Sequence, residues 1–157
     1  MMRALSAAAL GLLIGLLSGC GILYRSTIDE DEAAERVDLY VEEAMGALPE
    51  QARLEPFGSS TSASCDENRV DRVTVDRQFW VKDLPEEENE QTMQMIYDHW
   101  IDSGYDLVSD ERPRDVRFHF ENDADDFKMF ASENRSGDIS IGAVSPCIWT
   151  EGTPRQR

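Results

Sequence analysis

The chain has 157 residues, a length that suits one domain and excludes a TIM barrel and most two-domain enzymes. Its 32 acidic residues outnumber its 15 Lys and Arg residues, so the net charge is −17. Such a surface repels phosphate backbones, and we therefore expect no nucleic-acid partner. Aliphatic residues are sparse beyond the first nineteen. All three Trp, four Tyr and six Phe lie there, however, and each can bury a large area on folding.

The N-terminus has the pattern of a secretory signal peptide. Met1-Met2-Arg3 is a short positive segment, and Ala4–Leu17 is apolar and uncharged. This apolar run is shorter than the ~20 residues that span a bilayer. We therefore predict that residues 1–19 are a signal peptide. A single Arg, rather than a twin pair, favours Sec export over Tat export.

The end of this segment, Leu17-Ser18-Gly19-Cys20, resembles the lipobox of bacterial lipoproteins. The resemblance implies that Cys20 receives a diacylglycerol thioether and becomes the first residue after cleavage. It also implies that the lipid anchors the chain on the extracytoplasmic face of the cell membrane, with residues 20–28 as a lipidated tether. Two or more acyl chains hold a protein stably at a bilayer. An ordinary signal peptide followed by an unrelated cysteine is the alternative.

Two further cysteines, Cys65 and Cys147, complete the set of three. If Cys20 carries lipid, these two are left in an oxidising compartment, where we expect them to form a disulfide. A bridge across so long a loop contributes a large share of the stability of a small domain. A metal site built on both cysteines is the alternative, although the sequence shows no third ligand.

The first predicted element of the mature chain is a helix that ends near Leu48. The acidic run Asp29–Glu32 fits its start, because acids there meet the positive end of the helix dipole; a calcium site is the alternative. Thr27 and Glu30 fit a capping box, and Pro49 ends the helix. One face is apolar at helical spacing, through Val37, Tyr40, Val41, Ala44, Met45 and Leu48.

The next stretch, residues 50–68, is predicted to be irregular because it contains a run of Ser, Thr and Ala. Residues 70–82 then alternate in polarity, which predicts a strand. Its apolar side is interrupted by Arg77 and comprises Val73, Val75, Phe79 and Val81. Its opposite side comprises Thr74, Asp76, Gln78 and Trp80.

A second helix is predicted from about Pro85 to Ser103, with Asp83 as its cap and Gly104 as a left-handed stop. Its apolar stripe comprises Met93, Ile96, Tyr97, Trp100 and Ile101. Four short strands follow, separated by polar turns, at residues 105–109, 116–121, 127–132 and 139–144, which is typical of an antiparallel meander. The sequence therefore predicts one α+β domain over residues 29–157, with two helices packed on one face of a mostly antiparallel sheet of about five strands.

Few residues suggest catalytic chemistry. The only histidines are His99 and His119, and no nucleophile elbow, zinc-binding pair or other catalytic signature accompanies them. We expect a protein without enzymatic activity, cofactor or metal; a hydrolase that uses one of these histidines is the alternative. Residues 122–126 resemble the opening of a calcium loop but lack the Gly and the distal Glu of an EF-hand. We therefore interpret them as a tight turn.

Three aromatic residues are candidates for partner binding. Trp80 lies on the polar side of its predicted strand, and Phe130 lies on the side of its strand opposite Phe127. If no helix covers the second face of the sheet, Trp80 and Phe130 form an exposed patch of the kind that marks binding sites. Trp149, just past the last cysteine, is the third candidate. The alternative is that the first helix or residues 50–68 cover the patch.

The two ends of the chain together resemble a type of small actinobacterial lipoprotein. Beside the lipobox, the resemblance rests on Gly137-Asp138-Ile139-Ser140-Ile141 and on Ser145-Pro146-Cys147-Ile148-Trp149, with Gly152 and Pro154. Arg also outnumbers Lys by 13 to 2, as is typical of a GC-rich genome. The resemblance implies a cellular address and a disulfide but no activity.

We therefore expect an envelope lipoprotein that binds another protein or a cell-wall component. The alternative is a carrier of a small apolar or lipid ligand held between the helices and the sheet. Its cavity would be lined by Met93, Trp100, Phe118 and Phe120.

Overall fold

The computed structural model describes residues 27–58, 61–67 and 69–154. The predicted signal peptide, Cys20 and residues 20–26 of the predicted tether lie outside the described residues. Within them the helical elements are α1 (Glu30–Met45), η1 (Glu86–Glu88) and α2 (Asn89–Asp102). The strands are β1 (Arg53–Pro56), β2 (Thr61–Asp66), β3 (Arg69–Lys82), β4 (Asp106–Asp110), β5 (Arg117–Asn122), β6 (Phe127–Glu133), β7 (Ile139–Val144) and β8 (Ile148–Trp149).

All strands pair antiparallel in one sheet, whose order is β1-β3-β7-β6-β5-β4. The long strand β3 pairs with β1 and β2 along one side and with β7 and β8 along the other. The α+β class is as predicted, but the sheet has eight strands rather than about five. The three additional strands, β1, β2 and β8, are short segments that border β3. Residues 50–68 are therefore not irregular throughout, because they contain β1 and β2.

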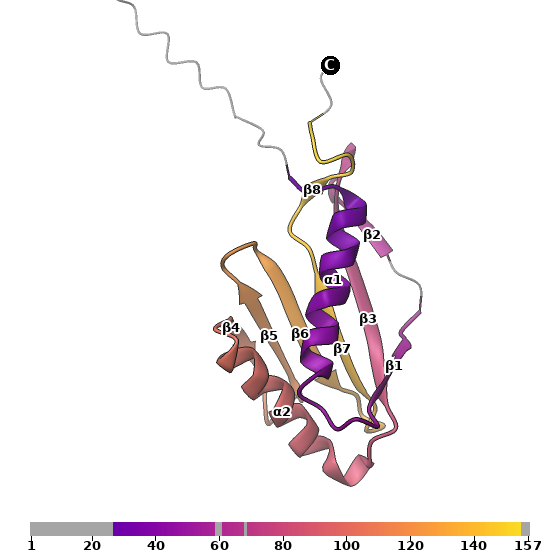
Figure 1. The fold of residues 1–157 in the computed structure, drawn as a ribbon, viewed down its shortest axis with the longest axis vertical. Coiled ribbons are helices and arrows are strands. Elements are labelled where there is room, and N and C mark those ends of the chain that lie inside the picture. Colours follow the sequence, from indigo (N-terminus) through magenta and orange to yellow (C-terminus); the bar gives the residue numbers. More distant parts are fainter. Residues whose placement is uncertain (1–26, 59–60, 68, 155–157) are drawn as a thin grey trace, which may run out of the picture.

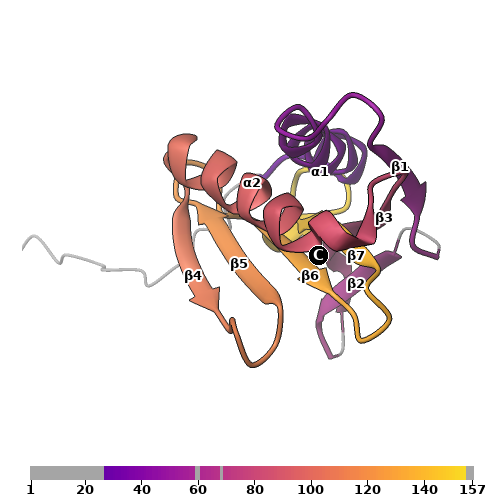
Figure 2. The ribbon, with the colours of Figure 1, turned by 90° about the horizontal axis from the view of Figure 1, so that it is seen from below.

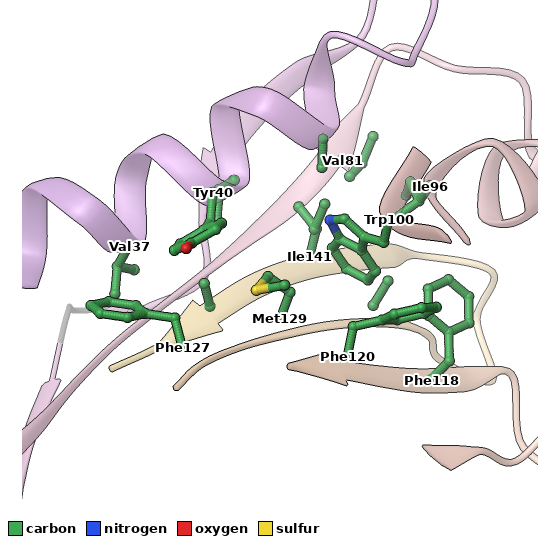
Figure 3. Packing of buried hydrophobic residues seen from close by; sticks show 14 of the residues in the cluster. Val37, Tyr40, Val81, Ile96, Trp100, Phe118, Phe120, Phe127, Met129 and Ile141 are labelled. Carbon is green, nitrogen blue, oxygen red and sulfur yellow. The ribbon is translucent and has the colours of Figure 1, made fainter. Parts of the chain in front are cut away.

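Both helices lie on the same face of the sheet (Figures 1 and 2). α1 packs against β3, β6 and β7, and α2 packs against β6 and α1. The predicted apolar faces point into this layer, except that Ile101 of the second helix is 44% exposed. The core between helices and sheet (Figure 3) includes Val37, Tyr40, Val81, Ile96, Trp100, Phe118, Phe120, Phe127, Met129 and Ile141.

The four side chains considered for an internal ligand cavity belong to this core. Met93, Trp100, Phe118 and Phe120 are each at most 1% exposed. The ring centroid of Trp100 lies 5.7 Å from that of Phe118 and 5.4 Å from that of Phe120. Aromatic pairs at these separations stabilise a packed interior. These side chains are therefore part of the packed core. Together they do not line a cavity that could hold the apolar ligand of the alternative hypothesis.

The predicted helix caps are wrong in detail. Asp29, not Thr27, caps α1, because its side chain accepts a hydrogen bond from the backbone N of Glu32 at 2.9 Å. The Thr27 hydroxyl instead accepts a hydrogen bond from the backbone N of Trp149 at 2.8 Å. Asp83 does not cap the second helix: it has a positive φ of 65° and pairs with Arg53 at 2.8 Å. The 3-10 helix η1 leads into α2 instead.

Residues 122–126 form the predicted turn between β5 and β6. The side-chain oxygen of Asn122 accepts a hydrogen bond from the backbone N of Ala124 at 3.0 Å, which is an Asx turn. Asp125 Oδ2 accepts hydrogen bonds from Tyr40 Oη at 2.7 Å and from Arg36 Nη1 at 3.1 Å. Two hydrogen bonds, one from the neutral Tyr40 hydroxyl and one from the Arg36 guanidinium, therefore hold the acidic turn against α1.

The predicted disulfide between Cys65 and Cys147 is present, with the two Cα atoms 6.1 Å apart. It joins β2 to the segment that connects β7 and β8. The same end of the domain holds both ends of the described chain (Figure 1), because the backbone N of Thr27 donates to the carbonyl of Gly152 at 2.9 Å. The described chain therefore begins and ends at the disulfide end of β3.

Candidate binding face

The second face of the sheet carries no helix in the described part of the chain (Figure 2). Because neighbouring strands are in register, its side chains align in rows that cross the sheet. One row consists of His119, Phe130, Gly142 and Gln78. The adjacent row consists of Arg117, Ser132, Ser140 and Trp80. We call these two rows the open face.

Phe130 lies over a glycine on this face. It stands directly opposite Gly142, and a Cβ built on Gly142 would lie 2.4 Å from Cζ of the Phe130 ring. Only a residue without a side chain leaves this space to the ring. The His119 ring lies beside it, with centroids 6.1 Å apart and planes inclined by 38°. The two rings therefore form a half-buried aromatic platform above the sheet.

A chain of hydrogen bonds runs beside this platform. Gln78 Nε2 donates to Ser140 Oγ at 3.0 Å, and the hydroxyls of Ser132 and Ser140 are 3.0 Å apart. Ser140 is only 3% exposed, whereas Gln78 and Ser132 are half-buried. The floor of the open face is therefore polar and held in a fixed arrangement.

Trp80 lies at the other end of its row and is half-buried. The ring of Phe57, which follows β1, is 4.5 Å from the Trp80 ring between centroids. Lys82 Nζ lies 5.2 Å from the ring centroid and also donates to Asp138 at 2.9 Å. This hydrogen bond lowers the pKa of Asp138 below its usual range. Phe57, from the 50–68 stretch, thus covers part of Trp80.

A cleft of about 530 Å³ lies on the open face, at the end of the sheet where β5 begins and β6 ends. Its lining includes the rings of His119 and Phe130 and, from the chain of hydrogen bonds, Gln78 and Ser132. Its rim is charged and comprises Asp115, Arg117, Glu133 and Arg135. Pockets that hold small molecules are typically ~300–1,000 Å³ in volume. The cleft is therefore large enough for a small ligand or for one unit of a polymer.

Charge is unevenly distributed between the two sides of the molecule. α1 has seven acidic residues and one Arg in its sequence EDEAAERVDLYVEEAM. η1 and α2 together have six acidic residues and neither Lys nor Arg. Both lysines of the chain, Lys82 and Lys128, lie on the side of the sheet that faces away from the helices. A partner thus meets a strongly anionic helical side but mixed charge on the open side.

Among the described residues, neither histidine belongs to a serine–histidine–carboxylate triad. His119 Nδ1 is 3.0 Å from Ser109 Oγ, but among the described residues no carboxylate hydrogen bonds to His119. A serine–histidine pair needs such a third group to orient the imidazole for nucleophilic catalysis. His99 lies on α2, and its Nε2 is buried without a partner in the described chain. The Ser109 contact therefore serves to fix the His119 ring.

The structure brings two of the three predicted binding aromatics to the open face. Trp80 and Phe130 both lie there, in adjacent rows. Trp149 does not contribute to the exposed patch, because it is 3% exposed and the guanidinium of Arg72 lies 5.4 Å from its ring centroid. The sequence missed Gly142 and Ser140, which meet Phe130 and Trp80 only once β7 is placed between β6 and β3.

A second groove, of about 540 Å³, opens between the start of α2 and the β4–β5 connection. Arg112 fills much of its wall: its guanidinium lies 4.5 Å from the Tyr97 ring centroid and 5.0 Å from that of Phe118. The Arg112 guanidinium also donates hydrogen bonds to Asp110 through Nε at 2.9 Å and Nη2 at 2.6 Å, and these hydrogen bonds lower the pKa of Asp110. Arg112 is thus held in place by contacts within the domain.

No family model matches the chain, and no curated protein or solved structure is significantly similar to it. None of the helices in the described residues is long and apolar enough to cross a membrane.

Proposed function

We propose that this protein is a membrane-anchored extracytoplasmic lipoprotein without enzymatic activity, which binds an envelope partner through the open face. The cleft beside Phe130 is the observation that carries the binding proposal. It combines an aromatic platform with polar and charged groups on a face that no helix of the described chain covers. Aromatic residues that line such clefts recur as anchors in binding sites.

The position of the cleft supports the proposal. The tether enters next to β8, which pairs with Arg72 and Val73 of β3. The cleft adjoins the other end of the sheet, where Val81 of β3 pairs with Ile139. A strand rises about 3.3 Å per residue, so these two ends are separated by roughly 30 Å. A domain held by a lipid on Cys20 would therefore present its cleft away from the membrane.

The anchor is tested by Cys20→Ala in the full-length protein. We expect this variant to leave the membrane fraction or to accumulate as an unprocessed precursor, because the thiol is the acceptor for the lipid. The matched control is the double variant Cys65→Ser/Cys147→Ser, which removes cysteines but keeps the anchor and should stay in the membrane fraction. Unchanged detergent partitioning of Cys20→Ala would contradict the proposal.

Binding is tested by sedimentation of the full-length protein, kept in detergent micelles throughout, with a washed envelope fraction from which lipids have been extracted by the same detergent, so that the proposed anchor has no bilayer to enter. We expect saturable co-sedimentation that Phe130→Ala weakens at least tenfold. The control is Leu39→Ala, which removes a side chain that is 55% exposed on α1. Equal binding by both variants would contradict a role of the open face. Protease treatment of the fraction then distinguishes a protein partner from a cell-wall glycan.

A further inference from the structure

The open face has the composition of a saccharide site. A sugar ring presents C–H groups on its faces and hydroxyls around its edge. It is therefore bound by an aromatic surface flanked by hydrogen-bonding side chains. Phe130 supplies the aromatic surface, and Gly142 leaves room for the ring to lie along the sheet. Ser132 and Gln78 line the same cleft and carry a hydroxyl and an amide, which can both donate and accept hydrogen bonds.

The fixed geometry of these groups favours binding. Ser140, which is 3% exposed, holds Gln78 and Ser132 by hydrogen bonds of 3.0 Å each. The Ser109 hydroxyl holds the His119 ring next to Phe130. Side chains that are already ordered lose little conformational entropy when a ligand arrives.

The rim of the cleft offers donors rather than acceptors. Its acidic groups are engaged: Asp115 accepts from Arg114 at 3.0 Å, and Glu133 accepts from Asn89 at 3.1 Å. Arg135 is exposed and has no hydrogen-bonding or ion-pair partner among the described residues. A guanidinium without a partner can donate two parallel hydrogen bonds to a carboxylate or a phosphate of a ligand.

Arg117 reinforces this donor character. It lines the same cleft, is 49% exposed and contacts Glu111 through Nε at 3.3 Å. The cleft thus has two arginines, although the net charge of the chain is −17. The rim therefore favours an anionic group on the ligand, although the molecule as a whole repels anions.

We propose that the cleft binds a saccharide that carries an acidic group. The sugar ring lies against Phe130, and its hydroxyls bind Ser132 and Gln78. The acidic group binds Arg135 and Arg117. This inference rests on the proposed binding function and names the class of ligand.

The test uses two sugars that differ only in the acid. N-acetylmuramic acid has the ring of N-acetylglucosamine with an added lactyl ether, which bears a carboxylate. Binding of each to the full-length protein in detergent is measured by saturation-transfer NMR titration. We expect both to bind, and the acidic sugar to bind five- to tenfold more tightly. Lactate alone should not bind measurably.

Variants test which residue binds the acidic group of the ligand and which residue binds its sugar ring. Arg135→Gln should lower the affinity for the acidic sugar toward that for the neutral one, with Arg117 keeping part of the difference, whereas Arg53→Gln, a control at a 58% exposed arginine on β1, should change neither affinity. Phe130→Ala should abolish binding of both sugars, and Phe130→Tyr, which keeps the ring, should restore it. The recovery with Tyr separates a lost contact from a lost fold.

Other outcomes overturn the inference. If both sugars bind with equal affinity and Arg135→Gln changes neither affinity, the cleft does not recognise an acidic group. Binding of lactate as tight as that of the acidic sugar would reduce the site to a simple anion site. If neither sugar binds while the envelope fraction still binds in a manner that depends on Phe130, the saccharide inference fails and the proposed function stands.

Discussion

The Phe130 ring occupies the space that a side chain on Gly142 would need. The two residues face each other on β6 and β7, and an added Cβ would lie 2.4 Å from the ring and 2.5 Å from the backbone carbonyl of Arg77. Real Cβ atoms do not approach other atoms so closely, so the strands or the ring must shift. The aromatic platform thus depends on a glycine in the neighbouring strand.

We predict that Gly142→Ala destabilises the domain by about 1–3 kcal/mol, the usual cost of overpacking a site that is already filled. The free energy of unfolding in urea measures this effect. In a Phe130→Ala background the same substitution should cost less, because the ring contact is gone, although the contact with the Arg77 carbonyl remains. Equal costs in both backgrounds would show that the ring does not restrict position 142.

The disulfide closes a loop of 82 positions. In the chain-entropy description, a loop of this length contributes about 4–5 kcal/mol to stability. The free energy of unfolding of small domains is only ~5–15 kcal/mol, so reduction of the disulfide should remove a large part of it. We predict a large fall in the urea midpoint when the protein is reduced, and the same fall for Cys65→Ser/Cys147→Ser. A change below about 1 kcal/mol would contradict the loop argument.

Arg77 interrupts the apolar side of β3, and its guanidinium forms an ion pair with Asp38 of α1. Its Nη1 donates to Asp38 Oδ2 at 2.6 Å, with about a third of each side chain exposed. Asp38→Ala should destabilise the fold by roughly 1–2 kcal/mol, a value reduced for solvent screening, because Arg77 loses its partner.

The double variant Asp38→Leu/Arg77→Met replaces this pair by apolar side chains. We predict that its stability in urea lies within about 1 kcal/mol of the natural chain, because apolar pairs often substitute for buried ion pairs without loss. If the double variant is less stable than Asp38→Ala alone, the ion pair is required for the packing of α1 on β3.

Tyr105 should make the fold sensitive to alkaline pH. Burial, and then the charge of Glu43, raises the pKa of Tyr105 to about 12, whereas a tyrosine in the unfolded chain titrates near 10. Above pH 10 the Tyr105 side chain loses its proton in the unfolded chain but keeps it in the folded chain. The contribution of Tyr105 to the free energy of unfolding is therefore fully present below pH 10 and is lost between pH 10 and 12. Tyr105→Phe should flatten this fall in urea unfolding measured at several pH values. An identical pH dependence in the variant would exclude Tyr105 as its source.

Alternation of polarity predicted the strands that carry the open face. In β3, β5, β6 and β7 alternate side chains enter the core, apart from Arg77 of β3. Such a period of two is visible in a sequence without knowledge of the neighbouring strands. The same period placed Trp80 and Phe130 on the side away from the helices, where the structure has them. The two helices were predictable because their apolar stripes recur at helical spacing.

The missed elements depend on contacts between distant segments. β2 is a run of mostly small polar residues and β8 has two residues, so neither shows a strand pattern of its own. Both are strands because the long strand β3 extends beyond β1 on one side, where it pairs with β2, and beyond β7 on the other, where it pairs with β8. The cap at Thr27 failed for a similar reason, since its hydroxyl binds the backbone of Trp149, which is 122 positions away.

The candidate site was predictable only in part. Each aromatic could be assigned to a face, but the cleft requires the register between β3, β7 and β6, which sets Gly142 beneath Phe130 and Ser140 beside Ser132. A sequence shows which side chains share a face of one strand. It does not show which side chains stand opposite each other across three strands.

The most direct measurement of the proposed binding role is photo-crosslinking in living cells that carry the full-length protein. A photoreactive amino acid replaces either Phe130 on the open face or Leu39, which is 55% exposed on α1. We predict that position 130 yields a discrete, saturable crosslink to an envelope component and that position 39 does not. A crosslink confined to position 39, or the same products from both positions, would contradict the assignment of the open face as the binding surface.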